Sequence, residues 1–323
     1  MKPKLFVLDD WEGCLERSGC WKQLGNQVDI QFAQGTVHSI PAPELERVNF
    51  LLAVRERTLL DESLLAKMPS LQLILQTGGH AYHIDLAAAE RRNIRIALGR
   101  NAKMPLHSVP ELTFAFMLGL AHRVYQGMKS MQRGEWERFT GGILAGKRLG
   151  ILGLGRHGSR VAEIARVAFN MEVVAWQRTP TDAQFSNEIK RLSLDELMST
   201  SDIVSVHLKL SDESLNLITR EKLSLMKPGA FLINTARGKI INEPALIETL
   251  KNSGIAGAAL DVFSEEPLAA DSPFRKMDNV LLTPHIGWTA KEVFEEFAEI
   301  ACKQLVQYLE KDPGLAFCRV HST

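Results

Sequence analysis

Three apolar runs in the second half of the chain are each followed by residues that can move charge or protons. Residues 231–234 precede Arg237, residues 258–260 precede Asp261 and Glu266, and residues 280–282 precede His285. A guanidinium can orient a substrate and polarise its carbonyl, while an imidazole can protonate the developing alkoxide. A carboxylate such as Glu266 can hold that imidazole in its charged form. These residue types suit hydride transfer to a ketone.

His285 can alternatively have a purely structural role. An isolated histidine is more often a hydrogen-bonded structural residue than a catalyst. A metal site is disfavoured, because His285 has no second histidine at ligand spacing. We therefore expect no metal. Because three strand ends each carry such a residue, a catalytic role for His285 is favoured over a purely structural one.

The elements that must position these residues alternate between short β-rich runs and helical stretches. Such alternation predicts parallel sheets covered by helices on both faces, with ligands beyond the carboxyl ends of the strands. We expect two doubly wound α/β domains. The predicted strands are residues 5–8, 28–32, 49–54, 71–76 and 94–97, then 148–152, 172–176, 202–208, 230–234, 255–260 and 279–282. Long helices are predicted at 110–127, with Pro110 in the first turn, and at 291–309.

A glycine-rich turn lies between the predicted strand 148–152 and the predicted helix 159–169. Its glycines, Gly153, Gly155 and Gly158, have the GxGxxG spacing that allows a tight turn and close approach of a pyrophosphate to a helix N-terminus. Glycines alone are weak evidence, since any strand–helix turn can use them. With a strand before it and a helix after it, the turn predicts dinucleotide binding.

The residues after the next strand bear on the choice of dinucleotide. An acidic residue usually ends this strand and binds the adenosine ribose of NAD. Here Gln177, Arg178 and Thr179 follow Trp176. A guanidinium with hydroxyl neighbours suits a 2′-phosphate, which favours NADP(H). NAD(H) remains open, because Arg178 can also be only a solvated surface charge.

The composition excludes several classes of protein. The 323 residues carry 38 Lys+Arg and 38 Asp+Glu, so no overall positive field favours nucleic acid. The hydrophobic fraction of 45% is ordinary for globular domains, and no apolar run approaches the roughly 20 residues that cross a bilayer. The four cysteines form no CxxC pair. We expect a cytoplasmic protein with no membrane or nucleic-acid partner.

The sequence resembles the D-isomer-specific 2-hydroxyacid dehydrogenase family over nearly its whole length. The resemblance rests on residues 149–158, 201–210, 226–238, 258–267 and 284–287. It implies a Rossmann NAD(P) domain, residues 104–290, inserted into a flavodoxin-like substrate domain, residues 1–103 and 291–323. It also implies an active site in the cleft between the domains and a homodimer. The substrate would be a small D-2-hydroxy or 2-oxo acid.

The resemblance also implies roles for individual residues. The catalytic set would be Arg237, Glu266 and His285, with His285 as acid/base. Cofactor contacts would come from Gly153, Gly155, Arg156, His157, Gly158, Gln177, Arg178, Thr179, His207, Thr235, Ala236, Asp261, His285 and Gly287. Substrate contacts would come from Arg55, Thr77, Gly78, Gly79 and Arg237.

Three departures from the family pattern leave alternatives open. The loop at Thr77–His80 differs from the commoner pattern, Gln177 replaces the usual aspartate, and Lys209 stands where the family often has proline. A short D-3-phosphoglycerate dehydrogenase, a glyoxylate/hydroxypyruvate reductase, and a phosphite or formate dehydrogenase are therefore alternatives within the enzymes. An NAD(H)-sensing protein of the corepressor type is the alternative from another class.

Overall fold

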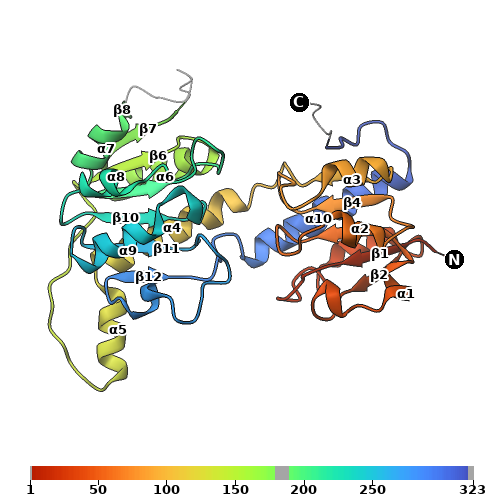
Figure 1. The fold of residues 1–323 in the computed structure, drawn as a ribbon, viewed down its shortest axis with the longest axis horizontal. Coiled ribbons are helices and arrows are strands. Elements are labelled where there is room, and N and C mark those ends of the chain that lie inside the picture. Colours follow the sequence, from red (N-terminus) through yellow and green to blue (C-terminus); the bar gives the residue numbers. More distant parts are fainter. Residues whose placement is uncertain (1, 179–188, 319–323) are drawn as a thin grey trace. The chain divides into compact units, whose positions relative to one another are not determined.

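The structure is a computed structural model that describes residues 2–178 and 189–318. The chain divides into two compact units (Figure 1). The first comprises Met1–Met104 and Thr289–Thr323, and the second comprises Pro105–Trp288. The chain thus leaves the first unit, builds the whole second unit, and returns. Each unit is built on one parallel sheet.

The sheet of the first unit has the strand order β2-β1-β3-β4-β5, which is the flavodoxin-like order. The α-helices α1 (Ala42–Leu45), α2 (Glu62–Ala66), α3 (Leu86–Arg91) and α10 (Lys291–Leu309) belong to this unit, together with the 3-10 helices η1 (Gly19–Leu24) and η2 (Val37–Ser39). The strands are β1 (Lys4–Val7), β2 (Asp29–Phe32), β3 (Val48–Ala53), β4 (Leu73–Gln76) and β5 (Arg95–Leu98).

Both faces of this first sheet are covered by apolar side chains. Residues of β1, β3, β4 and β5 form one buried cluster with α1, α2 and α3. The ring of Phe50, on β3, meets Tyr308 of α10 edge-on at 5.8 Å. Helix α10 buries residues such as Phe294 and Phe297, so the C-terminal helix completes the N-terminal unit.

The sheet of the second unit has the order β12-β11-β10-β9-β6-β7-β8. Its first six strands along the chain follow the doubly wound order of dinucleotide-binding folds. The strands are β6 (Arg148–Leu152), β7 (Glu172–Trp176), β8 (Lys190–Arg191), β9 (Ile203–Val206), β10 (Phe231–Asn234), β11 (Gly257–Leu260) and β12 (Val280–Leu282). The helices are α4 (Pro105–Ala121), α5 (Val124–Gln132), α6 (Arg156–Phe169), α7 (Leu194–Thr200), α8 (Arg220–Ser224) and α9 (Glu243–Lys251), with the 3-10 helices η4 (Gly238–Ile240) and η5 (Pro273–Lys276).

Neighbouring residues along these strands pack on opposite faces, as the pleat requires. Ile233 packs with α4 and α6 on one face, while Leu232 packs with α7, α8 and α9 on the other. Ala259 and Ala258 divide between the two faces in the same way. The predicted α/β class with two doubly wound parallel sheets is confirmed.

Two local predictions were wrong. Pro110 lies inside α4, which begins at Pro105 rather than at residue 110. The predicted helix 110–127 is also two helices, because Arg123 has a left-handed φ of 56° between α4 and α5. The two-residue strand β8 was missed, since so short an edge strand leaves no periodic signal.

Among the described residues, no helix is long and apolar enough to cross a membrane.

Candidate active site

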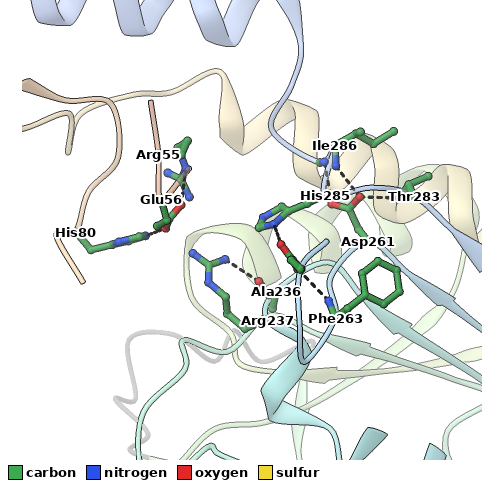
Figure 2. Close-up of polar contacts among 12 residues, drawn as sticks. Arg55, Glu56, His80, Ala236, Arg237, Asp261, Phe263, Thr283, His285 and Ile286 are labelled. Carbon is green, nitrogen blue, oxygen red and sulfur yellow. Dashed lines mark hydrogen bonds and ion pairs between the residues drawn. The ribbon is translucent and has the colours of Figure 1, made fainter. Parts of the chain in front are cut away.

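The strands that precede the predicted catalytic residues end level with one another. Asn234 at the end of β10 pairs with Leu260 of β11, which pairs with Leu282 of β12. Because the three strands are parallel neighbours, the residues that follow them meet at one edge of the sheet. Arg237, Asp261 and His285 lie at this edge (Figure 2), and Glu266 follows β11 at the same edge.

Glu266 and His285 form a hydrogen-bonded pair. The Nδ1 atom of His285 lies 2.7 Å from Oε2 of Glu266, and the backbone N–H of Phe263 donates to the other carboxylate oxygen at 2.9 Å. Burial raises the pKa of Glu266, but the hydrogen bond and charge of His285, the Phe263 N–H and nearby Arg237 outweigh it and lower the pKa below its usual range. The carboxylate is therefore ionised at neutral pH. It fixes the proton on Nδ1 and leaves Nε2 as the nitrogen that can exchange a proton.

The backbone presents His285 in a left-handed conformation, with a φ of 56°. This conformation is uncommon for a residue with a side chain and persists where surrounding structure imposes it. Asp261 imposes it here. One of its oxygens accepts hydrogen bonds from the Thr283 hydroxyl at 2.6 Å and the Ile286 N–H at 2.7 Å. The other accepts from the Gly287 N–H at 2.8 Å, so this carboxylate ties down both sides of His285.

Asp261 is only 1% exposed. Burial raises the pKa of this carboxyl group above its ordinary value, and the bonds from Thr283, Gly287 and Ile286 act in the opposite direction. The sequence singled out Asp261 for a cofactor contact through the resemblance alone. Its role in holding the His285 turn was missed, because the three donors are defined only by the folded turn.

Arg237 lies in a turn that Asn234 stabilises. The buried Asn234 side chain accepts from the Ala236 N–H at 3.0 Å and donates to the Arg237 carbonyl at 2.9 Å. The guanidinium donates to the Ala236 carbonyl at 2.7 Å. Thr235 shares a 3.2 Å hydroxyl contact with Thr113 of α4. Asn234 was not predicted as a functional residue, although its position between a buried strand and Arg237 was visible in the sequence.

The glycine turn has the geometry that a dinucleotide needs. Gly153 has a φ of +98°, and a Cβ on Gly158 would lie 2.1 Å from the Gly153 carbonyl oxygen, so both positions need glycine for the fold itself. Apart from its two neighbours in the chain, a Cβ on Gly155 would meet no atom of the described residues within 4 Å. Gly155 is also the N-cap of α6, whose first turn carries Arg156 and His157 and no acidic residue. These features fit a pyrophosphate at the helix N-terminus.

The strand ends beside this turn carry the other predicted cofactor residues. Arg178 forms an ion pair with Glu213, and Gln177 precedes it directly after β7. Thr179 lies outside the described residues. The His207 ring, at the end of β9, lies 2.8 Å from the Ser205 hydroxyl. Burial, together with the charge of His157, lowers the pKa of His207 to about 3, so the ring is neutral at pH 7.

The predicted substrate residues of the first unit gather after β3 and β4. The Arg55 N–H donates to the Thr77 hydroxyl at 2.9 Å, and a Cβ on Gly78 would lie 2.9 Å from the Arg55 guanidinium. Glu56 contacts both Arg55, at 3.5 Å, and His80, at 2.8 Å (Figure 2). Gly79 follows in the same loop, where a Cβ would have room. Glu56 and His80 were not among the predicted site residues.

No group of three histidine, cysteine or acidic side chains that could hold a metal occurs within residues 2–178 and 189–318.

Comparison with known proteins decides the family. Residues 114–287, more than half of the chain, match the family described as "D-isomer specific 2-hydroxyacid dehydrogenase, NAD binding domain". The chain belongs to this family.

Individual 2-hydroxyacid dehydrogenases are similar over most of the chain. A glyoxylate reductase of Pyrococcus horikoshii is 32% identical over 324 residues, which cover 95% of this chain and 93% of the relative. A D-3-phosphoglycerate dehydrogenase of Methanocaldococcus jannaschii is 36% identical, but the match covers 80% of this chain and only 49% of that protein. A crystal structure of D-lactate dehydrogenase from Aquifex aeolicus, complexed with NAD and lactic acid, aligns with a TM-score of 0.81 at 28% identity and covers 96% of each chain.

Membership of the 2-hydroxyacid dehydrogenase family confirms three predictions. The protein is an enzyme, an oxidoreductase that acts on CH–OH donors or the corresponding ketones. It uses a nicotinamide cofactor and transfers hydride on 2-hydroxy or 2-oxo acids. Because dehydrogenase activity accounts for the dinucleotide-binding fold, an NAD(H)-sensing role of the corepressor type is not needed to explain it.

Proposed function

We propose that the protein is a reductase of small 2-oxo acids of the glyoxylate and hydroxypyruvate type, with Arg237, Glu266 and His285 as its catalytic residues. The contact that carries the proposal is the 2.7 Å bond between His285 Nδ1 and Glu266 Oε2. It fixes one nitrogen of the imidazole and leaves the other for the substrate. Arg237 comes from the neighbouring strand end and supplies the positive charge that a 2-oxo acid needs.

Each of these residues has a distinct part in the reaction. When bound, the nicotinamide cofactor supplies the hydride that reduces the carbonyl carbon. Arg237 binds the substrate carboxylate and polarises the carbonyl oxygen. His285 donates the proton on Nε2 to that oxygen as it becomes an alkoxide. Glu266 stabilises the imidazolium before this transfer, and in the oxidative direction His285 accepts the proton.

The charges of the first unit favour a substrate with a single negative group. Arg55 is paired with Glu56, and Arg57 forms a bidentate pair with Glu12 at 2.6 and 2.8 Å. We propose that Arg55 and the backbone N–H groups of Gly78 and Gly79 bind the substrate carboxylate, since the Thr77 N–H already donates to the Ala53 carbonyl at 3.1 Å. The two acidic partners offset the charge that a second anionic group would require.

A short D-3-phosphoglycerate dehydrogenase is the second candidate. The relative from Methanocaldococcus jannaschii supports it. A phosphate group would need additional cations, yet Arg55 and Arg57 both have acidic partners. We therefore rank this candidate below the reductase of small 2-oxo acids.

The cofactor is proposed to lie along the glycine turn and to be NADP(H) by preference. Gly155 allows close approach, and the N-terminus of α6 attracts the pyrophosphate. Arg178 would bind the 2′-phosphate, because no carboxylate follows β7 directly. His207, Thr235, Ala236, Asp261 and Gly287 are proposed to contact the remainder of the cofactor.

We propose that the enzyme is a homodimer that works in the cytoplasm. Large apolar side chains are exposed on α5 and the segment after it: Val124, Met128, Met131, Trp136 (78% exposed) and Ile143. So many exposed apolar residues in one stretch suit a self-association surface. Light scattering should give about 72 kDa, twice 36.0 kDa, and Met131→Asp should lower that mass. Activity in the cytosolic fraction of a cell lysate tests the location.

The function is tested by initial rates with NADPH and NADH against glyoxylate, hydroxypyruvate, pyruvate, 2-oxoglutarate and 3-phosphohydroxypyruvate. The proposal predicts the highest kcat/KM with NADPH and with glyoxylate or hydroxypyruvate. A preference for 3-phosphohydroxypyruvate would favour the second candidate. Faster turnover with NADH would keep the reductase and refute the role of Arg178.

A further inference from the structure

An ion pair joins the two loops that flank the glycine turn. Arg178 follows β7, and Glu213 lies in the loop after β9; the guanidinium Nη1 contacts Oε2 of Glu213. In the sheet, β6 lies between β7 and β9. Since the three strands are parallel, both loops emerge at the edge where β6 ends in the glycine turn. The pair therefore lies on the adenosine side of the proposed cofactor site.

The loop that carries Glu213 is fixed by its own hydrogen bonds. The Ser211 hydroxyl donates to Glu213 Oε2 at 3.0 Å. Ser214 is buried, and its hydroxyl accepts from the Ser211 N–H at 2.8 Å and donates to the Lys209 carbonyl at 2.7 Å. Glu213 is thus held toward Arg178 rather than being a freely moving surface acid.

Glu213 is ionised at neutral pH. The Ser211 hydroxyl, the backbone of Glu213 and the charge of Arg178 lower the pKa of its carboxyl group. A carboxylate in this position competes with any other anion for the Arg178 guanidinium. It also repels a phosphate dianion at short range, where salt screens the interaction only partly.

We propose that Glu213 is a specificity-determining residue that weakens binding of the 2′-phosphate cofactor by competing for Arg178. This inference rests on the proposed role of Arg178. A 2′-phosphate has to displace the carboxylate from the guanidinium, whereas a 2′-hydroxyl carries no charge and leaves the pair intact. Glu213 therefore sets how strongly the enzyme prefers NADPH over NADH.

The test is a double-mutant cycle with wild type, Glu213→Gln, Arg178→Gln and the double variant. The dissociation constants of NADPH and NADH are measured by fluorescence titration at low ionic strength, without substrate. Exposed charge pairs contribute modestly, so Glu213→Gln should tighten NADPH binding about 3- to 10-fold. NADH binding should stay within about 2-fold, because the 2′-hydroxyl is neutral. Asp212→Asn, the neighbouring exposed acid, is the matched control and should change neither constant.

The cycle separates the failure of this inference from the failure of the proposed function. Arg178→Gln should weaken NADPH but not NADH. In that background Glu213→Gln should tighten NADPH less than it does in the wild type, because only the direct repulsion between carboxylate and phosphate remains to be removed. If Arg178→Gln leaves the NADPH to NADH ratio unchanged, the proposed role of Arg178 is wrong. If Arg178→Gln weakens NADPH but Glu213→Gln has no effect or weakens it further, the competition is refuted while Arg178 keeps its role. An equal gain in both backgrounds would also overturn the competition.

Discussion

Alanine at Gly155 and alanine at Gly158 should affect the glycine turn in different ways. At Gly158 the new Cβ would lie 2.1 Å from the Gly153 carbonyl oxygen and 3.2 Å from Ile151. Helix α6 would have to move away from β6 by about 1 Å to relieve the first contact. At Gly155 the new Cβ would meet no atom of the described residues within 4 Å beyond its chain neighbours, and the φ of −79° suits alanine.

The two substitutions should therefore change different quantities, the stability of the fold and the affinity for the cofactor. Gly158→Ala overpacks the turn, which costs about 1–3 kcal/mol and should lower the Tm of a unit of this size by roughly 2–12 °C. Gly155→Ala should change stability by less than about 1 kcal/mol, because loss of a weak N-cap is offset by a stiffer unfolded chain. It should weaken NADPH binding about 10- to 150-fold, the equivalent of one lost charge-assisted hydrogen bond.

Thermal unfolding and cofactor titration of the two variants test this reasoning together. Gly229→Ala is the control, since its Cβ also has open space and it lies outside the turn. It should retain the Tm and the affinity of the wild type. Wild-type affinity in Gly155→Ala would refute the placement of the pyrophosphate. Wild-type Tm in Gly158→Ala would refute the close packing of helix on strand.

Four further predictions concern Glu266, Arg237 and Asp261. Glu266→Gln should lower kcat about 10- to 100-fold, because a neutral amide stabilises the imidazolium less than a carboxylate does; unchanged kcat in steady-state assays would contradict the pair. Since the folded state lowers the pKa of Glu266, its ionised form stabilises the fold above its unfolded pKa. That stability is lost as pH falls through the lower folded pKa. In melting curves between about pH 3 and 6, the Tm of the wild type should therefore fall toward acid pH, and it should fall less in Glu266→Gln. Arg237→Lys should raise KM and lower kcat, since an ammonium cannot form the bidentate contact; kinetics like those of the wild type would refute its role. Asp261→Asn should destabilise the second unit by about 1–3 kcal/mol, because an amide cannot accept from both sides of the turn; calorimetry with an unshifted Tm would contradict this.

The sheet and its rim were predictable because the signals are local. Each strand is a short apolar run, and in a parallel sheet the residue after the run must lie at the carboxyl edge. Arg237, Glu266 and His285 can therefore be assigned to this carboxyl edge from the sequence alone. The glycine turn was equally clear, since its strand and helix adjoin it.

Contacts between distant loops left no such signal. Arg178 and Glu213 are 35 residues apart, and nothing in either segment indicates the other. The three donors to Asp261 become its partners only when the turn folds around it. The early start of α4 is not predicted because two prolines suit a first helical turn; the sequence favours Pro110, whereas the helix begins at Pro105.

The most direct test of the proposed mechanism is single-turnover reduction of glyoxylate by His285→Gln loaded with NADPH. Glutamine keeps a similar size but cannot deliver a proton from a titrating group. We expect an affinity for NADPH within about 2-fold of wild type and a rate of hydride transfer lower by about 100-fold or more. Hydride transfer at the rate of the wild type, with NADPH bound normally, would contradict the assignment of His285 as the acid.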